Sequence, residues 1–431
     1  MGKSPAIHTR RNMQKLPLTL KLCTACALFM ASPAFAESLT DDIHGRLQLT
    51  GQMDATDNDS LSASLGEQYR KDAYADLRLT WEPRWNNWDA TFHYQATADG
   101  GNDVAYRRKS GASFTSAPPS TLFDLSGTML DESNALVTHK IDRMAIGYST
   151  PGFVIRVGRQ ALTWGAGKMF QTMDLVGPFA PNTVDTEYKP GVDMAYTQWL
   201  FDDGSDLQFV AAPRARRHGD EVRWDASTVA LHYRRAFGDI GTTWLLSHDY
   251  DNWVAGLGLS GPLYGASWNI EVTPTFDVAG NTKFSGLANI DYAMLLFGER
   301  NTTLFAEYYH NGFGVGGDTQ VYDQLPAYLT ERLARGQVFN ISRNYLSSGM
   351  TVEWTPLLKF SPSLIANLDD TSFYASTEAN YSLGDNTTLL VGAQTPIGPA
   401  GTEYGGISLS GGTAPYVAPS SMIYVQLRQY F

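Results

Sequence analysis

The sequence predicts an all-β chain that folds into a transmembrane, antiparallel up-and-down β-barrel of about 18 strands (16–18). Three observations lead to this fold class. Many runs of roughly ten residues alternate apolar and polar side chains, as membrane strands do. The links between these runs alternate between short and long. The chain also begins with a segment typical of exported proteins and ends, at Phe431, on an alternating run.

The alternation is clearest in Ala90–Ala96, Trp268–Val272 and Met350–Trp354. Successive side chains of a strand point to opposite faces, so each such run presents one apolar and one polar face. We expect strands near 43–53, 73–82, 88–97, 135–149, 153–162, 191–201, 206–213, 226–236, 241–249, 252–260, 266–276, 284–297, 302–311, 345–355, 362–370, 373–383, 387–396 and 420–431.

The N-terminal residues 1–36 predict a cleaved signal peptide. Five basic residues precede the apolar stretch Leu22–Met30, and Ala34–Ala36 has the small-x-small pattern of a cleavage site. Residues 37–431 would then form a single barrel domain. Both cysteines, Cys23 and Cys26, fall in the signal, which excludes disulfides, cysteine–metal sites and a cysteine nucleophile from the remaining chain. We expect no cofactor and no metal site.

Composition agrees with a membrane barrel. The chain has 22 Tyr, 20 Phe and 10 Trp, while its mean hydropathy is only −0.24. Barrel strands produce no hydropathy peak, and aromatic residues mark both membrane interfaces. The same composition also permits an alternative, a large periplasmic β-sandwich. The net charge of −12 argues against nucleic acid as a partner.

The last strand carries the first family resemblance. Ile423, Val425, Leu427 and Phe431 share one face of the terminal run. This run resembles the C-terminal strand of Gram-negative outer-membrane barrels, which ends in Phe. The resemblance implies a place in the outer membrane, with lipid and lipopolysaccharide as surroundings and the barrel-insertion machinery as a partner that reads Phe431.

Link lengths separate a barrel from a sandwich. Short turns such as Ser149–Gly152 and Gly384–Asn386 follow every second strand, whereas the alternate links are mostly long, as in 98–134 and 312–344. Periplasmic turns and external loops of membrane barrels differ in this way, whereas Greek-key sandwiches do not sort their links by length. The loop 312–344 holds a predicted helix, Tyr322–Ala334, interpreted as a packed cover, with a gate or ligand clamp as the alternative.

A longer motif narrows the resemblance. Gly158-Arg-Gln160 is followed by Trp164-Gly165 and by Pro190-Gly-Val-Asp193. The pattern resembles porin-like barrels that include alginate-export-type and related uncharacterised families. In alginate-export barrels the wall is arginine-lined for an anionic polysaccharide, whereas the inward charges expected here are mixed. The loop 163–190 is the candidate for a constriction that folds into the lumen.

Strand parity predicts which charges face inward, because a charge at lipid depth costs about 2–4 kcal/mol. We expect two opposed arcs, one basic and one acidic, with a transverse field between them. The predicted pore-lining residues are Arg78, Arg143, Arg156, Arg234, Arg428, His232, Glu271, Glu307, Glu353 and Glu378.

The predicted function is a porin or channel that lets small polar or charged solutes diffuse, or be exported, through a water-filled lumen. We expect no enzyme and no catalytic residue. A barrel that sheathes a partner protein is one alternative. An outer-membrane hydrolase that uses Ser247, His248 and Asp249 is a weaker alternative. Ser247 and His248 are neighbours on one strand, so their side chains point to opposite faces and cannot form a catalytic dyad.

Overall fold

The computed structural model describes residues 42–111, 121–215, 220–317, 321–411 and 413–431. The predicted signal peptide, residues 1–36, lies outside these ranges. The barrel belongs to the compact unit His44–Phe431. Within the described ranges, no helix is both long and apolar enough to cross a membrane.

Eighteen strands form the wall, each hydrogen-bonded to its neighbours in the chain. All of them run antiparallel to those neighbours wherever the register is defined, and each overlaps one predicted strand. Their bounds are β1 Ile43–Ala55, β2 Tyr69–Trp81, β4 Trp88–Gly101, β6 Ala135–Thr150, β7 Phe153–Gln160, β8 Val192–Leu200, β9 Asp206–Ala212, β10 Thr228–Phe237, β11 Ile240–Asp249, β12 Asn252–Leu263, β13 Ala266–Phe276, β14 Thr282–Leu296, β15 Arg300–His310, β16 Asn344–Thr355, β17 Leu358–Asn367, β18 Phe373–Gly384, β19 Thr387–Ile397 and β22 Ser421–Tyr430.

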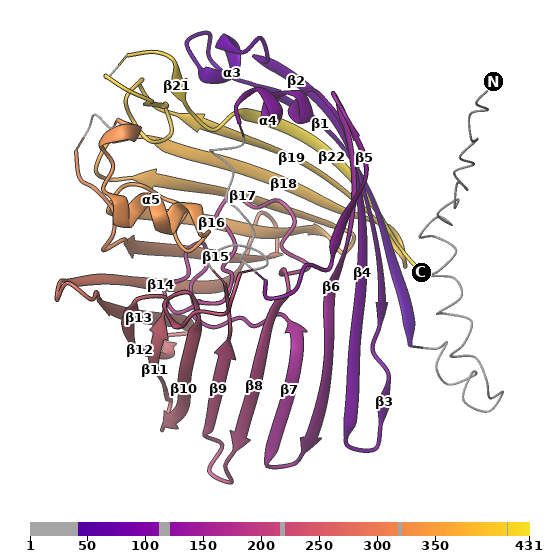
Figure 1. The fold of residues 1–431 in the computed structure, drawn as a ribbon, viewed down its shortest axis with the longest axis vertical. Coiled ribbons are helices and arrows are strands. Elements are labelled where there is room, and N and C mark those ends of the chain that lie inside the picture. Colours follow the sequence, from indigo (N-terminus) through magenta and orange to yellow (C-terminus); the bar gives the residue numbers. More distant parts are fainter. Residues whose placement is uncertain (1–41, 112–120, 216–219, 318–320, 412) are drawn as a thin grey trace, which may run out of the picture. The chain divides into compact units, whose positions relative to one another are not determined.

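The last strand closes the wall. β22 pairs with β19 on one side and with β1 on the other, where Arg46 lies opposite Tyr430 and Ala55 opposite Ser421. The pairing runs to the final residue, because Gly45 N donates to Phe431 O at 2.7 Å and Phe431 N to Gly45 O at 3.0 Å. Figure 1 shows the first strand, indigo, beside the last, yellow. The prediction of a closed, antiparallel barrel of about 18 strands is confirmed.

Smaller elements decorate this wall. Two additional strands pair with it, β3 Arg84–Trp85 and β5 Ser126–Glu132, and a separate hairpin joins β20 Ile407–Ser408 to β21 Tyr416–Val417. Among the described residues, the helical elements are α3 Leu61–Ser64, α4 Asn102–Lys109, η1 Trp224–Ala226, η2 Tyr322–Gln324 and α5 Ala327–Ala334. The single predicted helix over 322–334 is wrong in extent: Pro326 separates η2 from α5 and serves as the N-cap of α5.

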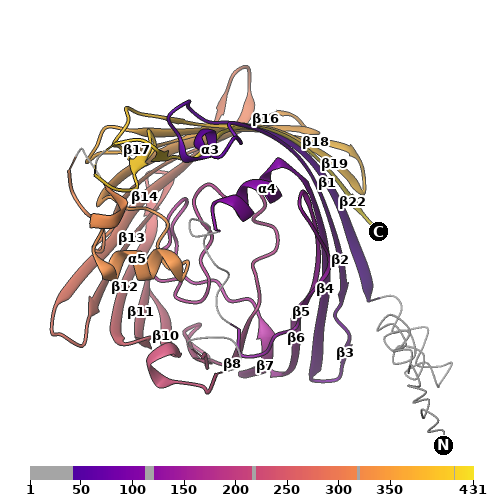
Figure 2. The same ribbon diagram turned by 45° about the horizontal axis from the view of Figure 1, so that its top comes forward.

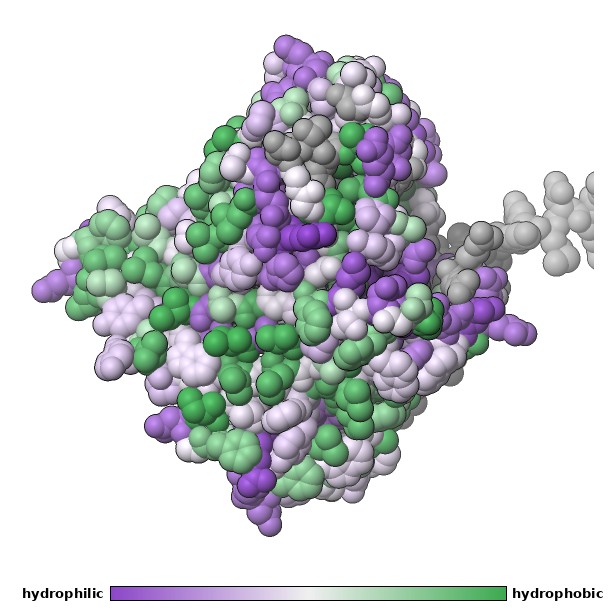
Figure 3. Space-filling model, turned by 90° about the vertical axis from the view of Figure 1, so that its left-hand side faces the viewer, coloured by the Kyte–Doolittle hydropathy of each residue, from purple (hydrophilic) through white to green (hydrophobic). Residues whose placement is uncertain are grey.

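Side-chain parity sorts the wall into two faces. On β22, the side chains of Ile423 and Val425 are 57% and 49% exposed on the outer face, while Gln426 is 2% exposed on the inner face. Figure 3 shows apolar side chains over much of the lower half of one outer face. The apolar-out, polar-in pattern predicted from the sequence is therefore the pattern of this strand.

A β-bulge in β6 resolves one conflict in the predicted parity. Alternation places Asp142 and Arg143 on opposite faces, which would turn Asp142 toward the outside. In the structure His93 lies opposite Arg143 and Tyr94 opposite Ile141, so Asp142 is the extra residue. A bulge leaves its extra residue without a partner in the ladder and re-aims its side chain. Asp142 accordingly bonds Arg78, and Arg143 bonds a loop inside the barrel.

The links sort into two ends of the barrel, which we call the short-turn end and the loop end. Tight turns are 151–152, 238–239, 264–265 and 385–386. Extended links are 102–134, 161–191, 213–227, 311–343 and 398–420. Three links at the loop end are nevertheless short, at 250–251, 277–281 and 368–372, of which the sequence predicts the first and the last. The predicted segregation of link lengths is confirmed.

A charge placed on the outer face tests this parity. We expect Val425→Arg to lower the free energy of unfolding by about 2–4 kcal/mol in lipid vesicles, because Val425 lies mid-strand on the outer face. Urea unfolding in phosphatidylcholine vesicles measures the change. Tyr264→Arg is the control, since Tyr264 is 98% exposed in a turn and should tolerate the charge. Equal stabilities of the two variants would contradict an outer face in lipid.

Candidate functional site

The link from β7 to β8, residues 161–191, enters the barrel interior; we call it the inner loop (Figure 2). Ala166 N donates to Glu271 of β13 at 2.6 Å, and Gln394 of β19 donates to Asn182 O at 3.3 Å. Glu187 accepts from Arg46 of β1 at 2.8 Å. The loop thus reaches several sides of the wall, and its predicted position inside the barrel is confirmed.

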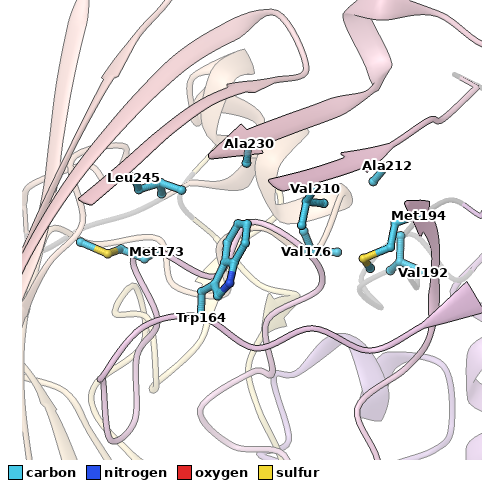
Figure 4. Packing of buried hydrophobic residues seen from close by; sticks show 9 residues of the cluster. All are labelled: Trp164, Met173, Val176, Val192, Met194, Val210, Ala212, Ala230 and Leu245. Atoms are coloured by element: carbon cyan, nitrogen blue, oxygen red, sulfur yellow. The ribbon is translucent and has the colours of Figure 1, made fainter. Parts of the chain in front are cut away.

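An apolar cluster holds the first half of the inner loop against β8–β11 (Figure 4). Trp164, Met173 and Val176 of the loop pack on inward side chains of these four strands, namely Val192, Met194, Val210, Ala212, Ala230 and Leu245. Removing this much apolar surface from water is favourable at roughly 25 cal/mol per Å². The inner faces of these strands are therefore occupied by the chain itself.

His232 lies under this cluster. Its ring stacks on Trp164 with centroids 4.8 Å apart and an angle of 4°. The indole Nε1 of Trp164 in turn donates to Gln208 of β9 at 2.8 Å. His232 is on the inner face, as predicted, but Trp164 covers it.

Two predicted pore-lining acids anchor the loop. Glu307 of β15 accepts from Lys168 N at 2.6 Å and from Met169 N and Phe170 N at 2.9 Å. Glu271 accepts from Ala166 N and, at 2.6 Å, from the hydroxyl of Thr172. A buried carboxylate is tolerated only when donors satisfy it, and here the donors are mostly loop amides. Both carboxylates point inward but hold the loop, so they leave no exposed acidic arc.

A buried ion pair closes the two ends of the loop. Lys189 Nζ contacts Asp174 Oδ2 and the carbonyl oxygen of Leu162. Burial raises the pKa of Asp174 to about 6 and lowers the pKa of Lys189, and the attraction between them opposes both shifts. Next to Lys189 the chain passes so close to β6 that a Cβ on Gly191 would lie 2.0 Å from Asp142 O. Only glycine fits there.

The sequence motif around the loop contains a bidentate pair. Arg159 and Asp193 lie opposite each other on β7 and β8, with Nε–Oδ1 at 2.9 Å and NH2–Oδ2 at 2.8 Å. Leu122 N and Phe123 N also donate to Asp193, at 2.8 and 3.1 Å. The motif Gly158-Arg-Gln … Gly-Val-Asp193 signalled this pair, although neither residue was among the predicted site residues.

The tip of the inner loop rests on inward arginines of β22, β1 and β2. Arg46 bonds Asp185 at 3.1 Å and Glu187 at 2.8 Å, and Arg428 lies 3.7 Å from each of these carboxylates. The ring of Tyr188 lies under two guanidinium groups, of Arg46 at 4.9 Å and of Arg78 at 4.2 Å. Sequence reasoning found Arg78 and Arg428 but missed Arg46, although the outward Leu47 and Leu49 of β1 give it the same parity signal. The loop-tip residues carry no such signal, because they lie outside the strands.

The other predicted cations have partners on the wall. Arg78 bonds Asp142 at 2.8 Å. Arg156 reaches Asp89 at 2.8 Å across Gly147, whose Cβ would collide with that carboxylate. Arg234 bonds Asp206 at 2.8 Å and is exposed.

Arg143 differs from these cations. Its one hydrogen bond within the described chain goes to Lys189 O at 3.1 Å, and its Nε has no partner there. Arg143 and Arg156 line, with Arg84 and Glu82, a cavity of about 160 Å³. Arg143 is thus an inward arginine bound by no carboxylate of the described chain.

The last two predicted acids lie apart. Glu378 of β18 accepts from Tyr424 at 3.3 Å on the inner face. Glu353 lies toward the short-turn end, where it accepts from Asn301 at 2.9 Å and pairs with Lys359 at 3.4 Å. Glu271, Glu307 and Glu378 thus lie on the inner face, as predicted, but Glu271 and Glu307 are taken up by the inner loop. Tyr309, Tyr345 and Tyr374 of β15, β16 and β18 also point inward on this side.

These tyrosines continue toward the loop end. Phe170 of the inner loop stacks on Tyr309 with centroids 4.4 Å apart, and Tyr374 meets Tyr404 of the loop 398–420 at 5.5 Å. Beside Tyr404, Glu403 accepts four hydrogen bonds, from Tyr345 at 2.6 Å, Asn367 at 2.8 Å, Ile341 N at 3.1 Å and Asn340 at 3.3 Å. Burial nevertheless raises the pKa of Glu403 to about 7.

The hydrolase alternative finds no assembled site at Ser247. Its hydroxyl donates to Val229 O at 3.0 Å, while His248 stacks on Trp224 at 4.2 Å on the opposite face. Asp249 accepts from Thr228 at 2.6 Å and from Gln337 at 2.7 Å. In the part of the chain that the structure describes, no group of three or more His, Cys, Asp or Glu side chains is arranged to hold a metal ion.

Comparisons with solved structures give the same architecture. The chain is similar to Pseudomonas aeruginosa OccK5 (OpdH), at 8% identity over 91% of this chain and 98% of that one, with a TM-score of 0.50. It is also similar to Acinetobacter baumannii OccAB2, at 10% identity over 91% and 99% of the two chains, with a TM-score of 0.51. The fold is that of an outer-membrane, porin-like β-barrel. A. baumannii OccAB3 has the same fold, at 9% identity, 91% and 99% coverage, and a TM-score of 0.50. No protein-family model and no curated protein matches.

The anchor of the inner loop can be tested with a matched pair of variants. We expect Glu307→Gln to speed hydrogen exchange of the amides at 168–170 by about tenfold or more, because an amide group cannot accept all the hydrogen bonds that the carboxylate accepts. Exchange followed by mass spectrometry measures it. Glu353→Gln, at a partly exposed carboxylate, should leave these amides unchanged. Unchanged exchange in Glu307→Gln would show that the carboxylate does not hold the loop.

Proposed function

We propose that this chain is an outer-membrane channel that lets small polar or charged solutes diffuse through its lumen. Support comes from the closed wall of eighteen strands, since barrels of 16–18 strands leave an aqueous interior. An apolar outer face and a polar inner face fit the same role. Lipid and lipopolysaccharide would surround the barrel, and Phe431, 62% exposed at the end of β22, would be read by the insertion machinery.

The observation that carries the proposal is the row of inward arginines beside the loop tip. Guanidinium groups on the wall of a water-filled passage attract anions and orient dipolar solutes. Most of these arginines share their charge with a carboxylate, whereas Arg143 does not. We therefore assign ion selectivity mainly to Arg143, with a smaller contribution from Arg156, which lines the same cavity but is paired with Asp89.

The alginate-export-type resemblance is the finer version of this proposal. It would extend the solute to an anionic polysaccharide and is supported by the motif that includes Arg159 and Asp193. Two features favour small solutes instead: the inner loop crosses the interior, and acidic side chains neutralise several arginines. The loop also lies where a sheathed partner protein would have to sit, which weighs against the scaffold alternative.

Single-channel recording in planar bilayers tests the proposal. We expect wild-type protein to conduct in KCl, and Arg143→Ala and Arg156→Ala each to lower the chloride-to-potassium permeability ratio by roughly twofold or more, because each removes a positive charge from the lumen. Arg235→Ala is the control, since Arg235 alternates with the inward Arg234 and pairs with Asp203 at 3.4 Å. Absence of conductance, or a ratio unchanged in both lumenal variants, would overturn the proposal.

A further inference from the structure

A second cavity lies at the loop end, where separate parts of the chain converge. It has a volume of about 450 Å³, and we call it the vestibule. Its lining includes α4, the inner loop, the loops 311–343 and 398–420, and the inner faces of β17 and β18. The residues used below are Tyr106, Asn182, Asn340, Tyr374, Glu403 and Tyr404. Its volume is within the range of 300–1,000 Å³ that small-molecule sites occupy.

We propose that the vestibule is a binding site for an uncharged, ring-containing solute that carries an amide or hydroxyl group. The proposal deepens the proposed function, on which it rests, by naming a solute class that the channel loads at its loop end. This solute class differs from the anions that the arginines of the lumen would attract, because the lining of the vestibule contains no Lys or Arg.

The small number of charged residues in the lining favours an uncharged ligand. All twenty lining residues are described, and none of them is Lys or Arg. An anion in the vestibule would lose its hydration without a cation to replace it, which is strongly unfavourable. The one carboxyl group, Glu403, already accepts hydrogen bonds at both oxygens, so it offers little to a cation. Neither sign of charge finds a partner.

The lining also favours a ring. Four tyrosines contribute to it, Tyr106, Tyr322, Tyr374 and Tyr404, and the last two lie 5.5 Å apart at an interplanar angle of 44°. Aliphatic side chains, among them Leu333 of α5, complete the wall. Aromatic rings gain from offset or edge-to-face contacts with other rings in addition to the burial of area. A flat apolar ring therefore suits these surfaces.

A polar pair within the lining fits a neutral amide or hydroxyl. Asn340 Nδ2 donates to the hydroxyl oxygen of Tyr404 at 3.2 Å and to Glu403. Among the described residues, the hydroxyl proton of Tyr404 has no acceptor and Asn340 Oδ1 accepts no hydrogen bond. One donor and one acceptor thus lie side by side. A primary amide or an alcohol complements both, whereas a carboxylate complements only the donor.

Three ring compounds of similar size test the assignment: benzamide, benzoate and benzylamine. Full-length protein in detergent is titrated with each probe, and saturation-transfer NMR gives the dissociation constants. We expect benzamide to bind saturably and benzoate and benzylamine to bind at least tenfold more weakly, because each would bring an unpaired charge into the vestibule. Benzoate or benzylamine binding as tightly as benzamide, or no saturable binding of any probe, would overturn the inference.

Two variants locate the site. Tyr404→Phe removes the hydroxyl that would donate to the ligand and should weaken benzamide binding about 3- to 10-fold, the loss of one hydrogen bond. Its matched control is Tyr381→Phe, because Tyr381 belongs to β18 but is exposed on the outer face. Ala180→Trp, which would fill the lining from the inner loop, should abolish binding. Equal affinity in wild type and both vestibule variants would contradict the assignment.

KCl conductance recorded on the same samples separates this inference from the proposed function. Conducting protein without selective benzamide binding refutes only the vestibule site. Selective binding by protein that does not conduct supports the site and refutes the channel.

Discussion

The pairing of β22 with β1 is the constraint on which the rest of the structure depends. Inside a bilayer no water is available to bond free backbone groups, so a sheet can cross it only when no edge remains open. The bonds between Gly45 and Phe431 bring this closure to the last residue of the chain. Once the wall is closed, the position of a residue along its strand determines the face on which its side chain lies. One face meets apolar surroundings, and the other encloses the interior.

The interior is arranged by a second constraint, the need of buried charge for partners. Glu271 and Glu307 find theirs in backbone amides of the inner loop, which fixes the loop across the lumen. Its tip then supplies Asp185 and Glu187 to the arginines on the opposite side. The interior thus has an arginine side and a tyrosine side, with one cavity lined by arginines toward the short turns and one without Lys or Arg toward the loops.

The strands of the wall could be predicted from the sequence because the signals for them are local. Alternation with period two and the lengths of the links place every strand of the wall, and parity gives the inner face for residues such as Arg78 and Glu307. The contact partners of these side chains could not be predicted, because strand parity gives the face on which a side chain lies but not the residue that it contacts. That Glu307 binds loop amides 137–139 positions away, or that Asp142 occupies a bulge, depends on tertiary packing that no local pattern records.

In the proposed channel, solutes pass the tip of the inner loop. The most direct measurement is the single-channel conductance of a variant in which residues 183–188 are replaced by a glycine–serine segment of the same length. Without Asp185, Glu187 and Tyr188, Arg428 would lose both of its carboxylate partners, and Arg46 would keep only Asp76 of β2. The predicted result is a higher conductance with a stronger preference for anions. Conductance and selectivity equal to those of the wild type would contradict it.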